Sequence, residues 1–309
     1  MNVAALWERL TTITLWSQGV RSRWLELDAY RIYSLIYSPS RPPLIDGRVV
    51  CVHGLGSSGA AYGALMPHLK NTWREVWSPS APGHGLSVTQ NAKMGESAHH
   101  SSSSTQHALY LAWEDILLQL SDEAPIDLIA ISLGGAISIR FAARYPERVT
   151  RLILCSPAGA RLDEKDIEHL RSVFRMTERG DGMRFLRTLY HRPPWWSWWL
   201  SRLVQKSLSA PHAQEIINQL KPGDGLDSQE ISDLTMPTLL IWGGRERVLP
   251  PSSLPYLVRH APSQLTLKQP PHLSHSPQRE CPEELAQLIL TWIDDLLAHR
   301  PNDHPSKAL

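Results

Sequence analysis

The stretch "DLIAISLGGAISI", residues 127–139, decides the fold. It opens as a continuous apolar run, which is typical of a strand buried on both faces, and it continues with the spacing of a helix. Ser132 stands between the two, with the small residues Ala130 and Gly134 on either side. A serine on a sharp turn from strand to helix, between small residues, indicates a hydrolytic nucleophile.

Similar short apolar runs recur along the chain and predict further buried strands. Helical spacing falls between several of them, notably over Thr105–Leu120 and residues 135–145. This alternation predicts an α/β fold with a mostly parallel central sheet and helices on both faces. Before it, "RWLELD" and "YRIYSLIY" alternate as an antiparallel edge pair. The buried runs are "RVVCV" (48–52), "REVW" (74–77), "IDLIAI" (126–131), "RLILC" (151–155), "TLLIW" (238–242) and "QLTLK" (264–268).

The chain of 309 residues suits one core with an inserted subdomain. About eighty residues after "LILCSPAG" contain helical spacing but no strand-like run, so they predict a helical cap. The expected organisation is an N-terminal helical appendage (1–22), a core in two parts (23–157 and 236–299) around the cap (158–235), and a disordered tail (300–309).

Composition excludes several classes of function. The 31 basic and 30 acidic side chains leave a formal charge of +1, so no basic surface predicts nucleic-acid binding. Three cysteines, two of them in apolar runs, favour reduced thiols and a cytoplasmic location. The start of the chain does not resemble a signal peptide, and no apolar run reaches the length of a membrane span. The oligomeric state stays open.

A serine nucleophile requires a base and a carboxylate that orients the base. In a sheet enzyme of this kind the chain order is serine, acid, histidine. Glu246 follows "TLLIWGG" and His272 follows "QLTLK", each at the C-terminal end of a strand, where catalytic groups of such sheets gather. We therefore predict Ser132, His272 and Glu246 as the catalytic residues. His275 in the same loop is the alternative base, and Asp163 is an alternative acid.

Acyl transfer also requires donors for the oxyanion that forms on the substrate. The stretch "CVHGLGSSG", residues 51–59, turns directly after a strand. We predict that the backbone N–H groups of Leu55 and Leu133 form the oxyanion hole. His53 and His84 belong to turns, and we interpret both as structural hydrogen-bonding groups.

Five motifs in order resemble the α/β-hydrolase fold superfamily, in its branch of capped esterases, lipases and carbon-carbon hydrolases. The resemblance covers about residues 25–298 apart from the cap, and it implies a serine hydrolase that needs no cofactor and no metal. In that family Ser80 would usually be an aspartate of structural importance, Ala130 a glycine and Glu246 an aspartate. The motifs are "VCVHGLGSS", "PSAPGHGLS", "LIAISLGGA", "MPTLLIWGGRERVLP" and "PPHLSHSPQRECPEEL".

The favoured hypothesis is a carboxylesterase or lipase-like enzyme that cleaves small or medium apolar esters through an acyl-enzyme. A carbon-carbon bond hydrolase or an acyltransferase with the same triad is the first alternative, because only the pocket would differ. A non-catalytic binding protein on a hydrolase scaffold is the alternative of another class.

The stretch "RPPWWSWWLSR", residues 192–202, falls in the predicted cap. We predict that Trp195, Trp196, Trp198 and Trp199 bind substrate; packing of the cap on the core is the alternative. Together with the amphipathic N-terminus, this cluster also suggests peripheral contact with a membrane. The histidines of "SAHHSSSSTQH", residues 97–107, match no metal-ligand spacing and are interpreted as part of a polar loop.

Overall fold

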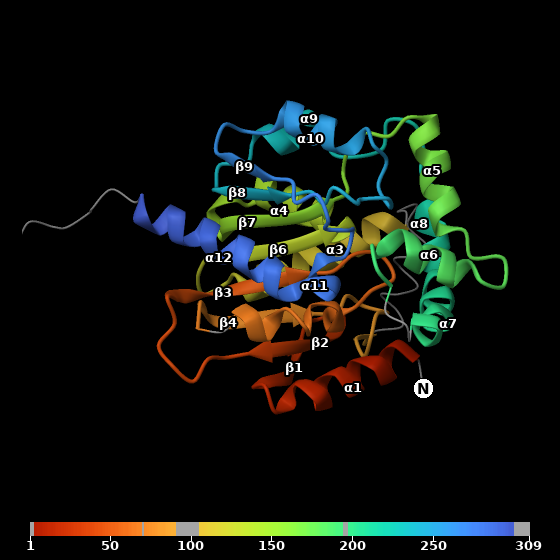
Figure 1. Ribbon diagram of the computed structural model, residues 1–309. Coiled ribbons are helices and arrows are strands. Elements are labelled where there is room, and N and C mark those ends of the chain that lie inside the picture. The colour runs from red at the N-terminus through yellow and green to blue at the C-terminus, as the bar shows by residue number, and fades with distance from the viewer. Residues whose placement is uncertain (1–2, 70, 91–104, 194–196, 300–309) are drawn as a thin grey trace, which may run out of the picture.

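The computed structural model describes residues 3–69, 71–90, 105–193 and 197–299. Their strands form one sheet in the order β1-β2-β4-β3-β6-β7-β8-β9, with β5 beside β2 (Figure 1). The strands are β1 (Val20–Glu26), β2 (Tyr30–Tyr37), β3 (Ile45–Val52), β4 (Trp73–Pro79), β5 (Val88–Thr89), β6 (Ile126–Ser132), β7 (Val149–Pro157), β8 (Thr238–Ile241) and β9 (Leu265–Lys268).

The pairing confirms the predicted sheet. β1 and β2 form an antiparallel hairpin, and β2 also runs antiparallel to β4. From β4 through β3, β6, β7 and β8 to β9, every neighbouring pair is parallel. β6 lies in the middle of this parallel part, so its C-terminal end, with Ser132, opens at the centre of one edge of the sheet.

Alternate residues of the central strands face two separate hydrophobic cores. Val50 and Leu128 belong to one, and Cys51 and Ile129 belong to the other. The first core includes side chains of α3 (Thr105–Leu120), α4 (Leu133–Arg144) and α10 (Ser253–His260). The second includes side chains of α1 (Val3–Trp16) and α12 (Pro282–Ala298). The helices therefore cover both faces, as the buried apolar runs predict.

Between β7 and β8, all the regular elements of the described residues are helices. They are α5 (Glu164–Phe174), α6 (Asp181–Leu189), α7 (Ser197–Leu208), α8 (Pro211–Asn218) and α9 (Ser228–Ser232). α5 to α8 lie together at the right of Figure 1 and α9 lies at the top beside α10; we call residues 158–235 the cap. Apolar side chains of the cap extend the first core, including Phe174 and Phe185.

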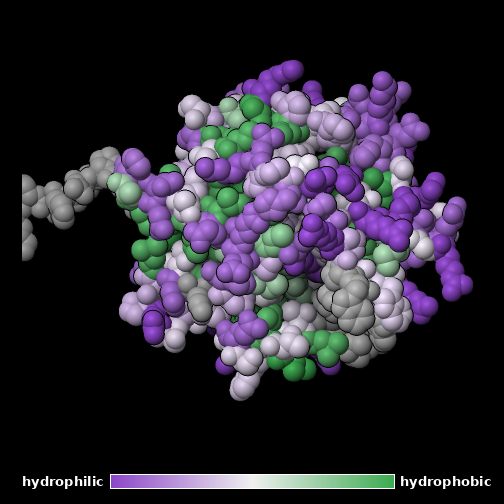
Figure 2. All heavy atoms as spheres, viewed as in Figure 1, coloured by the Kyte–Doolittle hydropathy of each residue, from purple (hydrophilic) through white to green (hydrophobic). Residues whose placement is uncertain are grey.

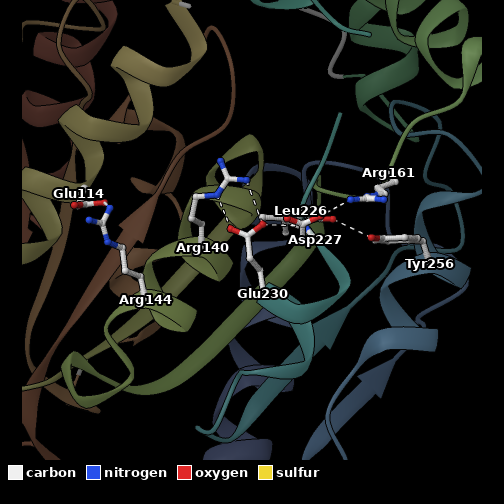
Figure 3. A network of polar contacts seen from close by, with 8 residues as sticks. All are labelled: Glu114, Arg140, Arg144, Arg161, Leu226, Asp227, Glu230 and Tyr256. Carbon is white, nitrogen blue, oxygen red and sulfur yellow. Dashed lines mark hydrogen bonds and ion pairs between the residues drawn. The ribbon is translucent and has the colours of Figure 1, made fainter. Parts of the chain in front are cut away.

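Ion pairs fix the end of the cap to the core (Figure 3). Arg140 of α4 binds Glu230 of α9, with 2.6 Å between Nε and Oε1. Arg161 at the start of the cap binds Asp227 near its end. The Tyr256 hydroxyl of α10 donates to the Leu226 carbonyl at 2.9 Å. The two chain crossings between core and cap are thereby joined to each other and to α4, the helix that begins after Ser132.

α1 lies along the edge of the sheet beside β1 (Figure 1), and β1 begins at Val20. The inward side of α1 includes Glu8 and Leu15, which are both buried. In the described part of the chain, no helix has both the length and the hydrophobicity to cross a bilayer. The predicted tail, residues 300–309, lies outside the described residues. The short α11 (Pro277–Glu280) completes the helices that matter for the site.

Candidate active site

Ser132 occupies the turn between β6 and α4 in a conformation that few residues adopt. Its φ is 54° and its ψ is −127°, which is a backbone geometry that costs energy for any residue with a side chain. Leu133 is the first residue of α4, and N–H groups of a first helical turn have no partner inside the helix. The turn therefore presents the serine hydroxyl beside unpaired backbone donors.

Close approach of β3 explains the glycine after the serine. A Cβ at Gly134 would lie 2.3 Å from the Val52 carbonyl oxygen, so no larger residue fits there. A Cβ at Gly54 would lie 3.0 Å from the Cβ of Ser132. Ala130, in contrast, pairs regularly with Val52 inside the sheet. The crowding that demands glycine thus lies after Ser132, and alanine is tolerated before it.

Glu246 and His275 form a buried pair. The distance between His275 Nδ1 and Glu246 Oε2 is 2.7 Å, and the two side chains are only 5 % and 4 % exposed. Glu246 Oε1 accepts hydrogen bonds from the N–H groups of Val248 and Leu249 at 2.7 and 3.0 Å. Burial alone would raise the pKa of Glu246, but His275 and the N–H donors bind the charged form and hold the pKa below its ordinary value.

The predicted partnership of Glu246 with His272 is wrong. His272 lies on the surface, where its side chain is 53 % exposed and its Nε2 is 2.7 Å from Glu284 Oε2. The alternative, His275, occupies the place facing Glu246. Asp163 is not an acid of this site either, because its carboxylate caps α5 and accepts from the Asp166 N–H at 2.8 Å.

Backbone contacts between two loops explain why His275 rather than His272 turns inward. The Arg245 N–H donates to the Leu273 carbonyl at 2.9 Å, and the Gly244 N–H donates to the Pro270 carbonyl at 2.9 Å. A Cβ at Gly243 would lie 2.3 Å from the Leu273 oxygen. Leu273 is buried, so the chain enters the interior only after His272. The sequence signal was weak: His272 belongs to the exposed turn that begins at Pro271, and burial begins only at Leu273.

The loop after β3 is tied to the loop after β4. His53 Nδ1–H donates to the Gly54 carbonyl at 2.9 Å, and its Nε2 accepts from the Ala81 N–H at 3.0 Å. Burial lowers the pKa of His53 to about 3, so the ring stays neutral. These contacts hold Leu55, the predicted oxyanion donor, in a loop that packs against Ser132.

A cavity of about 560 Å³ opens above the nucleophile turn. Ser132, His275 and Leu55 line it together, and His272 does not. Most of the remaining wall is apolar and comes from the cap. The apolar lining includes Ile131, Phe174, Phe185, Leu186, Leu189, Leu200, Leu203, Val204, Leu208 and Val248.

Trp198 does not line this cavity. Its side chain is 51 % exposed, while Leu200, Leu203 and Val204 of the same helix face the cavity. A helix directs consecutive residues to different sides, so neighbouring tryptophans could not all face inward. Trp195 and Trp196 lie outside the described residues, as does the side chain of Trp199.

Comparison with known proteins finds a matching family and relatives that are hydrolases. Residues 49–288 match the model of a family described as the alpha/beta hydrolase family. A pimeloyl-[acyl-carrier protein] methyl ester esterase of Neisseria meningitidis is 26 % identical over 84 % of this chain and 79 % of its own. A 2-hydroxy-6-oxo-2,4-heptadienoate hydrolase of Pseudomonas putida is 30 % identical over 65 % of this chain and 73 % of its own.

A bacterial membrane phospholipase A has a similar structure, with a TM-score of 0.76 over 95 % of this chain and 92 % of its own. Its sequence is 22 % identical, so this likeness shows the fold alone. The fold class inferred from the sequence is confirmed, and the relatives are esterases and other hydrolases.

Proposed function

The chain belongs to the alpha/beta hydrolase family, and from this premise we propose that it is a serine esterase that cleaves small or medium apolar carboxylic esters. The observation that carries the proposal is the buried His275–Glu246 pair, which shares one cavity with Ser132. A base held by a buried carboxylate, beside a serine on a strained turn, has the parts that acyl transfer requires.

The proposed reaction runs through an acyl-enzyme. Ser132 Oγ attacks the ester carbonyl while His275 Nε2 accepts the hydroxyl proton. Glu246 binds the Nδ1–H side of the ring, which leaves Nε2 as the basic nitrogen and stabilises the imidazolium that forms. The N–H groups of Leu55 and Leu133 hold the oxyanion. His275 then protonates the leaving alcohol, and water, deprotonated by His275, releases the acid and frees Ser132.

The test is hydrolysis of p-nitrophenyl esters over a range of acyl lengths, with Ser132→Ala as the control. Activity should fall on the order of 10⁴-fold or more in this variant. A fluorophosphonate should label the wild-type protein but not Ser132→Ala, which separates an enzyme from a binding protein on the same scaffold. Undiminished ester turnover by Ser132→Ala would overturn the mechanism.

Two buried acceptors in the cavity narrow the proposed substrate. His84 Nδ1–H donates to the Pro82 carbonyl, so Nε2 carries a lone pair, and burial lowers the pKa of this histidine to about 4. Neither His84 Nε2 nor Gln278 Oε1 has a hydrogen-bond partner among the described residues. A substrate hydroxyl or amide N–H would satisfy them. Gln278→Leu should therefore lower kcat/KM for a hydroxyl-bearing ester more than for its unsubstituted analogue; equal effects would refute this preference.

Carbon-carbon bond hydrolysis is the second candidate, because one relative named as a hydrolase of a hydroxy-oxo-dienoate is 30 % identical. The same serine, histidine and carboxylate would serve that reaction, so the site geometry supports both. Assaying aromatic diketone-type substrates beside esters distinguishes them. A kcat/KM for the diketones far above that for every ester would favour the second candidate.

We further propose a cytoplasmic protein that contacts anionic membrane surfaces through α1. Ile13 and Trp16 are 70 % and 62 % exposed on its outer side, and Arg21 lies over the Trp16 ring (Figure 2 shows hydrophobic residues along this lower edge). Apolar side chains beside arginines suit an anionic bilayer. Replacing Ile13 and Trp16 by serine should abolish sedimentation with anionic vesicles, and Leu44→Ser, an exposed leucine elsewhere, should not. Unchanged binding would refute this contact.

A further inference from the structure

Glu8 is a carboxylate of α1 that lies fully buried beneath the active-site loops. Its side chain is 0 % exposed. The Ser80 hydroxyl donates to Oε1, and the Leu86 N–H donates to Oε2 at 2.7 Å. The Ser58 side chain and the Ala60 backbone lie near enough to help lower the pKa of Glu8 against the effect of burial. The two hydrogen-bond partners of Glu8 come from the loop after β4, and Ser58 and Ala60 belong to the loop after β3.

These two loops shape the proposed site. The loop after β3 carries Leu55, and the loop after β4 carries His84, which lines the cavity. Ser80 joins them, because its hydroxyl donates to Glu8 and accepts from the Gly59 N–H at 2.9 Å. A connected path of hydrogen bonds therefore runs from α1 to the loop of the proposed oxyanion hole.

The core is shaped to receive this helix. Gly85 has a φ of +56°, and a Cβ there would lie 2.1 Å from Glu8 Oε2. A Cβ at Gly63 would lie 2.7 Å from Leu15 Cδ1 of the same helix. Two core positions thus lack side chains where α1 approaches, so α1 is an integral part of the active-site scaffold rather than the separate appendage its sequence suggests.

Stability alone is a poor explanation for this carboxylate. Removing a carboxylate from water costs several kcal/mol unless hydrogen bonds compensate, and an apolar residue would anchor a helix at lower cost. Moreover, Ser80 stands where the resemblance leads one to expect an aspartate. Glu8 brings a carboxylate from a distant part of the chain to that same place.

We propose that Glu8 is a positioning residue of the esterase reaction: it holds the loops after β3 and β4 together so that the Leu55 N–H meets the oxyanion. This inference rests on the proposed function. Glu8 does not touch the substrate and acts only through the loop. Its loss should therefore affect the transition state more than ground-state binding.

The experiment compares Glu8→Ala, Glu8→Gln and the double variant Glu8→Ala/Ser80→Asp, using a p-nitrophenyl ester below the melting temperature of each. Leu15→Ala is the matched control, because it weakens the packing of α1 against the segment near Gly63 while leaving Glu8 and its hydrogen bonds in place. We expect Glu8→Ala to lower kcat by about 10- to 100-fold with KM within about threefold, since a displaced oxyanion donor loses part of its effect. Affinity for a boronic acid, which forms a tetrahedral adduct on serine, should fall in parallel.

The double variant Glu8→Ala/Ser80→Asp tests most directly whether a carboxylate at this place is needed. A carboxylate restored at position 80 should recover most of the lost kcat, and Glu8→Gln should lie between wild type and Glu8→Ala. If Glu8→Ala does not fold, the other two variants still decide the question. Wild-type kcat in Glu8→Gln, no rescue by Ser80→Asp, or an equal loss of kcat in Leu15→Ala would overturn the inference. An inactive, unlabelled wild type would instead overturn the proposed function.

Discussion

Replacing His272 and His275 separately by alanine tests which histidine of the loop before α11 is the catalytic base. His275→Ala removes the group bound to Glu246 and facing the cavity, so kcat should fall on the order of 10⁴- to 10⁶-fold, which corresponds to about 5 to 8 kcal/mol in the activation barrier. The fold should survive, because Glu246 keeps the donors Val248 N–H and Leu249 N–H.

His272→Ala is the matched control from the same loop. It removes a half-exposed ion pair with Glu284, which is worth about 0 to 1 kcal/mol of stability, and kcat should stay within about twofold. The assay is kcat and KM for p-nitrophenyl butyrate, with melting temperatures recorded for both variants. A large loss of kcat in His272→Ala with near-normal turnover in His275→Ala would refute the assignment of the base.

Three further outcomes follow from the buried groups and close contacts. Glu246→Gln should lower kcat by about 10³- to 10⁴-fold at unchanged KM, because the imidazole then loses its charged partner; steady-state kinetics over pH measure this. Gly134→Ala should destabilise the protein by more than about 3 kcal/mol in urea unfolding. Gly83→Ala should cost about 1 kcal/mol, because its φ is +76° but an added Cβ would meet no heavy atom of the described residues within 4 Å beyond its chain neighbours. Burial raises the pKa of Glu8 from 4.5 to about 7, so the native state binds the proton more tightly than the unfolded state. The free energy of unfolding should therefore fall by about 3 kcal/mol between pH 4.5 and pH 8 relative to Glu8→Gln, with denaturant unfolding as the measurement; a pH-independent difference would contradict the buried carboxylate.

The sequence predicted the parallel sheet, and the apolar runs mark the strand ends near which Ser132 and Glu246 lie: Ser132 is the last residue of β6, and Glu246 is in the loop after β8. Strand ends are set by local pattern, and parallel strands bring those ends to one edge. The choice between His272 and His275 depends on contacts that local pattern does not encode. It is decided by backbone hydrogen bonds from Arg245 and Gly244, which lie far away along the chain.

The direction in which side chains point was the second feature that the sequence did not predict. The tryptophan-rich stretch predicted that aromatic side chains of the cap bind substrate. Composition does not say which side of α7 faces the cavity, and leucines of α7 rather than Trp198 line the cavity. Glu8 was not predicted at all. Helical periodicity marks apolar residues as inward, so a buried carboxylate among them gives no signal in a single sequence.

The ion pair between Arg140 and Glu230 makes the attachment of the cap more sensitive to salt than the His275–Glu246 pair is. Its side chains are 38 % and 22 % exposed, whereas His275 and Glu246 are almost completely shielded from solvent. Dissolved ions screen exposed charges over about 8 Å at physiological ionic strength and affect shielded pairs much less. Rising salt should therefore loosen the seating of the cap over the cavity while leaving the proton-transfer machinery intact, which makes ionic strength a means of changing substrate access independently of the chemical step.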